Sequence, residues 1–283
     1  MHELIHPAGI DTPVRTTFRP ARKWPYNNVI RKLSILIPVY NEASTIAVLL
    51  DKVIGVDLIN NIEKEILIVN DYSKDGTDDV IKDYILKHPQ AEIQYFSHDT
   101  NRGKGAAIHT GIRHASGDYL LIQDADLEYD PDDYNALLRP VVKGQADVVY
   151  GSRFIGGNPH RVLFFWHTIG NRFLTFLSNM SCNLNLTDME TGYKLFRTSL
   201  IQQIQLKEQR FGIEPEITAK IARVRGARIY EVGISYYGRT YQEGKKIRWR
   251  DGVRAIFCIL KYGFFARKAI NIPVHEVNMA SAY

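Results

Sequence analysis

Cysteine is scarce in this sequence, and the scarcity narrows the class of protein. The 283 residues contain two cysteines, Cys182 and Cys258. Two cysteines cannot build the disulfide framework that stabilises many small secreted domains. Their number and separation are typical of a reducing compartment. We therefore predict a cytoplasmic protein.

Long apolar runs are also missing. No stretch reaches the roughly 18 uninterrupted apolar residues expected of a membrane-spanning helix. Residues 1–20 have no apolar core flanked by basic residues, as a secretory signal would have. We therefore expect neither a transmembrane helix nor a secretory signal.

Charge of one sign does not dominate the composition. The net charge is +5, with 24% charged and 45% hydrophobic residues, which is the composition of a folded globular protein. A moderate positive excess favours anionic partners such as phosphates, nucleotides or an acidic membrane surface. Nothing in the sequence indicates a nucleic-acid partner, and it does not predict an oligomeric state.

Apolar strands alternate with amphipathic helices from residue 33 onward. We predict strands over 33–40, 65–70, 92–98, 119–126 and 146–154, with helices over 42–55, 76–88, 103–115 and 131–144. This alternation predicts an α/β fold with a doubly wound, mainly parallel sheet and helices on both faces. The near-continuous apolar strands agree with a sheet that is buried on both sides.

The pattern changes after Gly151. We predict a helix rich in Phe and Trp over 161–180, strands over 191–196 and 228–237, a mostly helical segment over 211–226, and a basic, apolar helix over 250–269. The two long helices mix aromatic residues with Arg and Lys, as helices at a membrane surface do. Ordinary packing of aromatic residues in a core is the open alternative.

Polar residues follow four of the predicted strands at their carboxyl ends. They are Tyr40-Asn41-Glu42, Asn70-Asp71, His98-Asp99 and Asp124 to Asp126. In parallel sheets ligands bind beyond the carboxyl ends of the strands. A purely structural sheet does not need such residues there, so the sequence predicts a ligand site at this edge.

Acidic residues alternate after the fourth predicted strand, in YLLIQDADLEYDP. Asp124, Asp126 and Glu128 share one face if the chain stays extended. Clustered carboxylates have raised pKa values unless a cation lies between them. Mg²⁺ or Mn²⁺ prefers such oxygen ligands and often retains phosphate oxygens. The alternative is a polar turn in which Asp130, before Pro131, starts the next helix; it explains Asp130 better than it explains the DAD motif.

Five motifs in order resemble a known family. They are LSILIPVYNEASTI, ILIVNDYSKDGT, NRGKGAAIHTG, LIQDADLEYDP and GSRFIGG. Together they resemble family 2 glycosyltransferases of the GT-A fold, and more narrowly the polyprenyl-phosphate glycosyltransferases of the dolichyl-phosphate mannose synthase type. The resemblance implies a nucleotide-sugar donor (a UDP- or GDP-sugar), a divalent metal ion, Mg²⁺ or Mn²⁺, and inversion at the anomeric carbon.

The resemblance also implies a division of the chain. We expect an irregular, proline-containing arm over 1–31, a GT-A domain over 32–247 with a nucleotide-binding half (32–130) and an acceptor half (131–247), and a C-terminal amphipathic helix and tail over 248–283. The expected GT-A fold also has a C-terminal extension on the acceptor side.

The same resemblance assigns the donor site. The positions that match the family's nucleotide contacts are Pro38, Tyr40, Asn41, Glu42, Asp71, Asn101, Lys104, Asp124 and Asp126. Asp124 and Asp126 become the DxD motif that meets the metal and the diphosphate, and Glu128 takes the place of a third metal contact. The family usually reads DDGSTDGT where this chain has Asn70-Asp71-Tyr72-Ser73, and this difference leaves the base preference open.

Four basic residues, Arg153, Arg172, Arg239 and Lys245, match the family's contacts with an acceptor phosphate. Arg239 and Lys245 lie in GRTYQEGKKIRWRDG, which resembles the family's Arg-x-Tyr-Gly-Glu-Ser-Lys loop, although Gln242 and Gly244 replace the family's Gly and Ser. Arg153 matches a third position, and a guanidinium group pairs bidentately with phosphate oxygens. The favoured acceptor is therefore a polyprenyl phosphate, dolichyl or undecaprenyl, reached by peripheral contact at the inner face of the membrane.

A hydroxyl group on a lipid, glycan or small molecule is the alternative acceptor. A lipid phosphate is already an anion near neutral pH, whereas a hydroxyl would need a general base. The family has an acid near the reaction centre at the position of Asp188, and Glu190, Glu214 and Glu216 are further candidates. The sequence does not choose among these carboxylates.

Two other classes of protein fit the sequence less well. A sugar-phosphate nucleotidylyltransferase should have a glycine-rich, basic loop after the first strand, where this chain reads PVYNEAS. A nucleotide-binding protein without enzymatic activity would not need the intact DAD motif.

Overall fold

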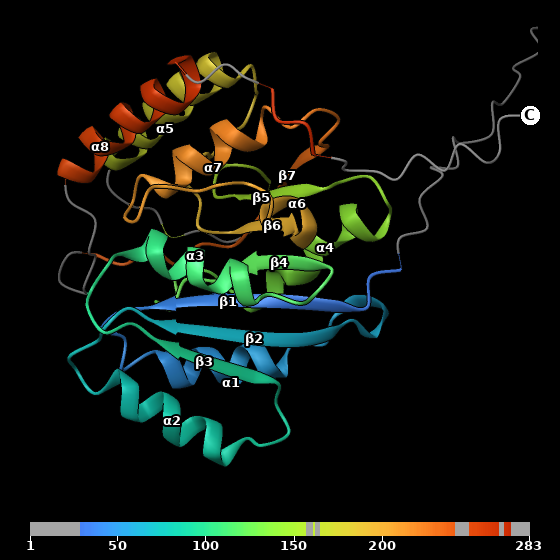
Figure 1. The fold of residues 1–283 in the computed structure, drawn as a ribbon, viewed down its shortest axis with the longest axis vertical. Coiled ribbons are helices and arrows are strands. Elements are labelled where there is room, and N and C mark those ends of the chain that lie inside the picture. Colours follow the sequence, from blue (N-terminus) through green and yellow to red (C-terminus); the bar gives the residue numbers. More distant parts are fainter. Residues whose placement is uncertain (1–28, 157–160, 162–164, 241–248, 266–268, 273–283) are drawn as a thin grey trace, which may run out of the picture.

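A mixed, mainly parallel sheet forms the centre of the molecule (Figure 1). The computed structural model describes residues 29–156, 161, 165–240, 249–265 and 269–272. Within them the seven strands are β1 (Lys32–Val39), β2 (Glu63–Asn70), β3 (Ile93–Ser97), β4 (Tyr119–Ile122), β5 (Val148–Ser152), β6 (Lys194–Arg197) and β7 (Ile229–Gly233). They lie in the order β3-β2-β1-β4-β6-β5-β7, and only β6 runs antiparallel to its neighbours. The predicted doubly wound sheet is confirmed.

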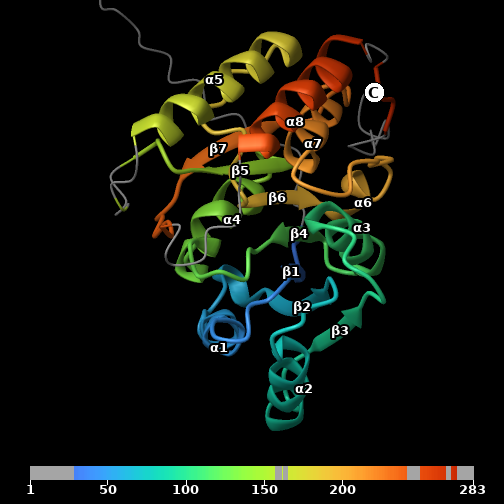
Figure 2. The same cartoon turned by 90° about the vertical axis from the view of Figure 1, so that its left-hand side faces the viewer.

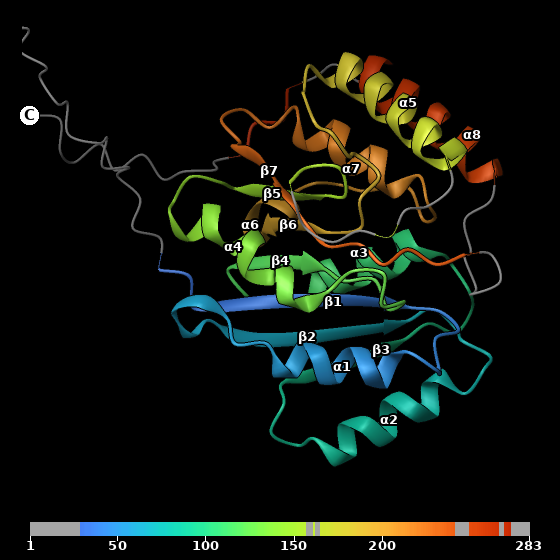
Figure 3. The same cartoon turned by 180° about the vertical axis from the view of Figure 1, so that it is seen from behind.

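Helices cover both faces of this sheet. They are α1 (Ile46–Gly55), α2 (Thr77–Lys87), α3 (Lys104–His114), α4 (Tyr134–Val142), α5 (Phe165–Cys182), α6 (Thr198–Ile201), α7 (Ile213–Ile221) and α8 (Trp249–Ile259). Apolar residues of α1, α2 and α4 pack on one face, and those of α3, α6 and α7 on the other. Figure 1 shows α3 in front of the sheet, and Figure 3, from behind, shows α1 and α4 in front.

The central strand β1 is buried on both sides, as its apolar run predicts. Leu33, Ile35 and Ile37 belong to the core under α1 and α4, and Leu36 belongs to the core under α3. Gly111 of α3 lies so close that an added Cβ atom would be 2.0 Å from Leu36 Cδ1. The missing side chain therefore lets α3 pack directly on β1.

Helices α5 and α8 form an outer layer. They lie side by side on the far side of α7 from the sheet (Figure 2). Buried Cys258 and Tyr262 pack against Ala219 of α7, and α8 continues into a π-helical turn (Leu260–Phe265). None of the helices that the structure describes is both long and apolar enough to cross a membrane.

The extended arrangement considered for the acidic motif is wrong. Strand β4 ends at Ile122, and Leu127 has a left-handed backbone with φ of 60°. The chain therefore turns through the motif, and alternate residues do not share one face. Asp130 accepts a hydrogen bond from the Asp132 backbone at the start of a 3₁₀ turn (Pro131–Asp133), so the polar-turn interpretation holds for this residue.

Three segments at the ends and at the junction of the expected division fall outside the described residues. These are residues 1–28 of the arm, residues 241–248 at the junction, and residues 273–283 of the tail. The division into arm, domain and tail therefore stays a prediction.

Candidate active site

The carboxyl ends of β1, β2, β4 and β5 meet at one edge of the sheet. The segments that leave these ends carry most of the predicted site residues. They are Tyr40 to Glu42 after β1, Asp71 after β2, Asp124 to Glu128 after β4, and Arg153 after β5. Pro38 is half-buried near the end of β1. The fold thus brings together groups that are far apart in sequence.

Asp71 is buried and anchors the loop that leads into α3. Its carboxylate accepts hydrogen bonds from Asn101 Nδ2 (2.9 Å), from the backbone of Arg102 (2.9 Å) and from the backbone of Gly103 (2.6 Å). His98 Nδ1 lies 2.8 Å from the same carboxylate. Asp71 therefore positions the loop, and a contact with a nucleotide base would be an addition to this role.

The turns after β1 and β2 are tied together. The Asn41 backbone donates to Ser73 Oγ (2.9 Å), and the Lys74 backbone donates to Asn41 Oδ1 (2.8 Å). The Glu42 backbone donates to Thr77 Oγ1 at the start of α2 (2.9 Å). These contacts fix the two turns relative to each other.

Asp124 and Glu128 have separate partners. Lys104 Nζ lies 2.7 Å from Asp124 Oδ1. Glu128 accepts hydrogen bonds from the Tyr236 hydroxyl (2.9 Å) and from the Arg239 backbone (2.6 Å). Glu128 is therefore engaged with the segment after β7.

Asp126 is the carboxylate whose charge is least compensated in this group. Burial raises its pKa, the negative charges of Asp124 and Glu128 raise it further, and Arg239 opposes them; the result is a pKa of about 7. Its Oδ1 accepts only a long hydrogen bond from the Glu128 backbone, at 3.3 Å, among those the structure describes. A cation beside Asp126 would offset the free-energy cost of ionising this buried carboxylate.

Asp124 and Asp126 suit a divalent metal ion, and Glu128, the third predicted contact, is hydrogen-bonded to Tyr236 and Arg239. Among the described residues no three acidic, His or Cys side chains form a group that could hold a metal. Asp124 Oδ2 lies against Gly192, where an added Cβ atom would be 2.2 Å away. Two carboxylates, one of them buried with a raised pKa, and the absence of a side chain at Gly192 fit an oxygen-liganded Mg²⁺ or Mn²⁺ that keeps other oxygen ligands.

Arg239 lies between the turn after β1 and the acidic motif after β4. Its Nη2 donates to Glu42 Oε2 (3.1 Å) and to the backbone oxygen of Asp126. Glu42 is itself buried and accepts from Thr45 Oγ1 (2.7 Å). Lys245, the other predicted basic contact of this segment, lies outside the described residues.

Arg153 and Asp188 form a bidentate ion pair. Arg153 Nε is 2.6 Å from Asp188 Oδ2, and Nη2 is 2.7 Å from Oδ1. Asn171 Nδ2 also donates to Oδ1 (3.0 Å). Burial raises the pKa of Asp188, but the Arg153 charge outweighs it and holds the pKa below its ordinary value. A fully buried, ionised and paired carboxylate is a poor proton acceptor, so Asp188 is better suited to orient Arg153.

Lys104 connects Asp124 to Glu214 of α7, and buried Lys194 pairs with the same glutamate. Lys104 Nζ lies 3.5 Å from Glu214 Oε1, and fully buried Lys194 Nζ donates to Glu214 Oε2. Burial lowers the pKa of Lys104, but Asp124 and Glu214 outweigh it and raise the pKa well above its ordinary value. Sequence reasoning missed Lys194, whose signal was a lysine inside the apolar strand TGYKLF.

The remaining candidate carboxylates, Glu190 and Glu216, differ in their hydrogen-bond partners. Burial and the charge of Glu214 raise the pKa of Glu190 to about 7, and its Oε1 accepts no hydrogen bond from the described residues. Glu216 accepts hydrogen bonds from the backbones of Lys207 (2.9 Å) and Glu208 (2.7 Å) and pairs with Lys220. Glu216 thus has a structural role, and Glu190 is the carboxylate suited to accept a proton.

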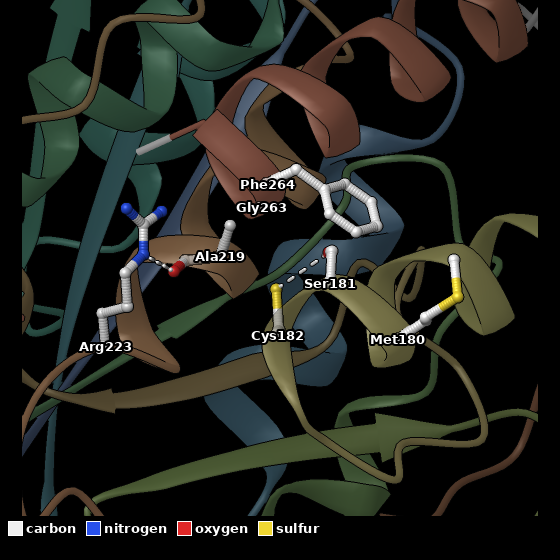
Figure 4. Close-up of a pocket in the computed structure, with 7 residues that line it drawn as sticks. All are labelled: Met180, Ser181, Cys182, Ala219, Arg223, Gly263 and Phe264. Carbon is white, nitrogen blue, oxygen red and sulfur yellow. Dashed lines mark hydrogen bonds between the residues drawn. The ribbon is translucent and has the colours of Figure 1, made fainter. Parts of the chain in front are cut away.

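A separate pocket of about 320 Å³ lies between the end of α5, α7 and the π-helical turn (Figure 4). Arg223, which lines it, donates from Nε to the backbone oxygen of Ala219 (2.8 Å) and from Nη2 to that of Tyr262. None of its lining residues comes from the strand ends, so this pocket is not part of the candidate active site.

Comparison with known sequences relates this chain to glycosyltransferases. The sequence model of a family described as glycosyl transferase family 2 matches residues 34–205. Dolichyl-phosphate beta-glucosyltransferase ALG5A of Trichomonas vaginalis is 30% identical over 269 residues, covering 90% of this chain and 77% of that protein. Undecaprenyl-phosphate mannosyltransferase of Micrococcus luteus is 28% identical over 242 residues, covering 82% and 94%.

Solved structures share the fold. Glucosyl-3-phosphoglycerate synthase of Mycobacterium tuberculosis, solved with Mn²⁺, UDP and its product, gives a TM-score of 0.63 at 17% identity, covering 82% of this chain and 80% of that one. Mannosyltransferase PcManGT of Pyrobaculum calidifontis, solved with GDP-Man and Mn²⁺, gives a TM-score of 0.60 at 19% identity, covering 91% and 70%. The observed sheet and helices thus match the GT-A fold.

Proposed function

Since the chain belongs to glycosyl transferase family 2 and is a glycosyltransferase, we propose that it moves a sugar from a nucleotide-sugar donor to a polyprenyl phosphate. We further propose that the transfer is metal-dependent and inverts the anomeric carbon. The observation that carries the proposal is the meeting of an acidic pair, Asp124 and Asp126, with Arg153 and Arg239 at one sheet edge. The polyprenyl-phosphate acceptors named for two relatives support it.

The donor side would hold a nucleoside diphosphate sugar. The proposed contacts of the nucleoside are the strand-end residues, which are Pro38, Tyr40, Asn41, Glu42, Asp71 and Asn101. Lys104 would bring positive charge to the diphosphate, since its ammonium is held beside Asp124. Asp124 and Asp126 would hold Mg²⁺ or Mn²⁺, and such an ion stabilises the negative charge of a leaving diphosphate.

The acceptor side would hold a phosphate group. Arg153 Nε and Nη2 donate to Asp188, so we assign the acceptor contact to Nη1. Arg239 would meet the same phosphate from the donor side, with Lys245 as a further proposed contact. The phosphate oxygen would attack the anomeric carbon as the bond to the diphosphate breaks, and an anionic nucleophile needs no general base.

A hydroxyl acceptor is the second candidate, and Glu190 is the observation that favours it. Its pKa of about 7 and its unpartnered Oε1 among the described residues suit a general base. Asp188, the base suggested by the family resemblance, is ionised and paired with Arg153.

The outer layer formed by α5 and α8 has the side chains expected for peripheral contact with the cytoplasmic face of a membrane. Apolar side chains are exposed along α5 and α8, with Trp166 at 78% and Phe257 at 51%. Arg172, Arg254 and Lys261 lie exposed among them. An apolar, basic helix pair suits the surface of an anionic bilayer. Free Cys182 and Cys258 agree with a reducing compartment.

Vesicle sedimentation tests the membrane contact. The double variant Trp166→Ala, Phe257→Ala should bind vesicles containing phosphatidylglycerol more weakly than the unchanged protein. Leu86→Ala is the control, because Leu86 is 80% exposed on α2, at the other end of the molecule. Equal binding by the double variant and the control would contradict this contact.

Arg153→Lys tests the acceptor assignment. Lysine keeps a positive charge beside Asp188 but lacks the bidentate fork. The KM for a polyprenyl phosphate should rise about tenfold or more, in line with loss of a charge-assisted hydrogen bond, while the KM for the donor should stay nearly unchanged. An unchanged KM for the lipid phosphate would remove Arg153 from the acceptor site.

A further inference from the structure

Tyr72 has a backbone conformation that a tyrosine rarely adopts. It directly follows Asp71 after β2, and its φ is 63°. This left-handed region favours glycine and, among other residues, Asn and Asp; a bulky side chain there is an outlier that costs free energy. The side chain is 43% exposed, so burial in a core does not explain the residue.

The surrounding turn holds this backbone in place from both sides. The buried carboxylate of Asp71 is fixed by the loop before α3. The Ser73 backbone donates to Asn70 Oδ1 (3.0 Å), and the Asn41 backbone donates to Ser73 Oγ (2.9 Å). The backbone that carries the Tyr72 ring is therefore held by the fold before any ligand binds.

A second exposed ring and a cation lie at the same place. Tyr40 is 36% exposed and follows β1, which pairs with β2 through Val39 and Asn70. Lys74 Nζ lies 5.5 Å from the centroid of the Tyr72 ring. Because this ammonium lies over one face of the ring, a flat base would stack on the opposite face, and its phosphates would find a cation nearby.

We propose that the ring of Tyr72 stacks on the nucleobase of the donor. The inference rests on the proposed function, because it takes this sheet edge to bind a nucleoside diphosphate. Stacking uses the π-face that every base has, so the ring strengthens binding of all bases. A purine offers the larger face, and the contribution of Tyr72 is therefore greater for GDP than for UDP.

Calorimetry with three ligands tests the proposal. Tyr72→Asn removes the ring and keeps a residue that accepts a left-handed backbone, and Tyr72→Phe keeps the ring. With Mn²⁺ present, Tyr72→Asn should bind GDP about tenfold more weakly than the unchanged protein, since base stacking on an aromatic ring contributes on this scale. Its affinity for UDP should fall by a smaller factor. Tyr72→Phe should stay within about twofold of the unchanged protein. Inorganic pyrophosphate, which has no base, should bind all forms equally.

Two controls separate stacking from a structural effect. The melting temperature of ligand-free Tyr72→Asn should equal or exceed that of the unchanged protein, because the strained tyrosine is gone. Tyr230→Asn changes a similarly exposed tyrosine, at 39%, on the edge strand β7, and should leave nucleotide affinity unchanged.

Different results would overturn different claims. Unchanged GDP and UDP affinity in Tyr72→Asn would overturn the stacking role while leaving the proposed function in place. Equal weakening of pyrophosphate and nucleotides would also overturn it, because the substitution would then act on the diphosphate site. If the unchanged protein bound pyrophosphate but no nucleoside diphosphate, the proposed function would fail together with this inference.

Discussion

A buried carboxylate beside two others destabilises a fold unless a proton or a cation compensates it. Asp126 is in this position, with a pKa of about 7 instead of the ordinary 3.8. The folded protein therefore holds a proton that the unfolded chain releases. In the metal-free protein this group's contribution to stability falls as the pH rises from about 4 to 7.

Asp126→Asn should remove that pH dependence. In EDTA at pH 8 the variant should melt at a higher temperature than the unchanged protein, because a buried charge has been removed. With Mn²⁺ and a nucleoside diphosphate the unchanged protein should gain stability and the variant should gain much less. Thermal melts across pH, with and without metal, measure both effects. A variant that kept the full gain from Mn²⁺ would show that Asp126 is not a metal ligand.

Asp188 and Glu190 should respond differently to loss of charge. Asp188→Asn leaves Arg153 with an uncharged partner, and breaking a buried ion pair typically costs about 3–5 kcal/mol.

Glu190→Gln should leave stability nearly unchanged. It should also leave turnover with a polyprenyl phosphate within a few-fold, since that acceptor needs no base. Denaturant unfolding and steady-state rates provide the readouts. A rate loss of about 10² or more in Glu190→Gln would favour the hydroxyl acceptor.

Individual residues could be predicted where a motif places them at a strand end. Asp124, Asp126 and Arg153 are found where the alternation of strands and helices puts them. The pairing of Lys194 with Glu214 was not predictable, because it joins residues that only the tertiary fold brings together. The left-handed backbone at Tyr72 gives a physical reason for the glycine in the family's DDGSTDGT motif.

The positions of the helices along the sequence could be predicted better than which of their faces pack against the core. The sequence indicated helices over 161–180 and 250–269, close to α5 and α8, but it left open whether their aromatic residues are inside. In α8, Cys258 packs against α7 and Ala255 is buried, whereas Val253 and Phe257 are exposed. The helix carries apolar residues on more than one face, and periodicity alone does not say which face meets the core.

One buried carboxylate helps to hold α8 and the π-helical turn that follows it on the rest of the molecule. Glu208 accepts hydrogen bonds from Arg254 Nη2 (2.6 Å), Tyr262 Oη (2.8 Å) and Lys261 Nζ (3.2 Å). Burial raises its pKa, but these hydrogen bonds outweigh burial and lower the pKa to about 2. Its stabilising contribution is therefore fully present above about pH 4.5 and is lost as the pH falls towards 2.

Glu208→Gln should loosen α8. We expect a loss of about 1–2 kcal/mol in unfolding free energy, because two of the three donors are half exposed and partly screened, and faster amide exchange in α8. Asp83→Asn is the control: its pair with Lys87 is exposed at both ends and should contribute less than about 0.5 kcal/mol. Equal losses in the two variants would contradict the special role of Glu208.

At the scale of the whole molecule, the fold class follows from the alternation of strands and helices. The reversal of β6 between β4 and β5 does not, because the chain after Gly151 no longer alternates regularly. This reversal places Gly192, just before β6, against Asp124, and β5 delivers Arg153 to the same edge. The residues that we propose for donor and acceptor binding are thus brought together by a topology that the sequence pattern did not predict.

A sugar-transfer assay with matched lipids tests the central claim most directly. The purified protein is incubated with Mn²⁺, a panel of radiolabelled UDP- and GDP-sugars, and either a short-chain polyprenyl phosphate or the polyprenol of the same length. The phosphate acceptor is expected to become labelled with at least one donor, with release of an equal amount of nucleoside diphosphate, and the polyprenol to stay unlabelled. Labelling of the polyprenol, or donor hydrolysis with no labelled lipid phosphate for any donor, would contradict the account.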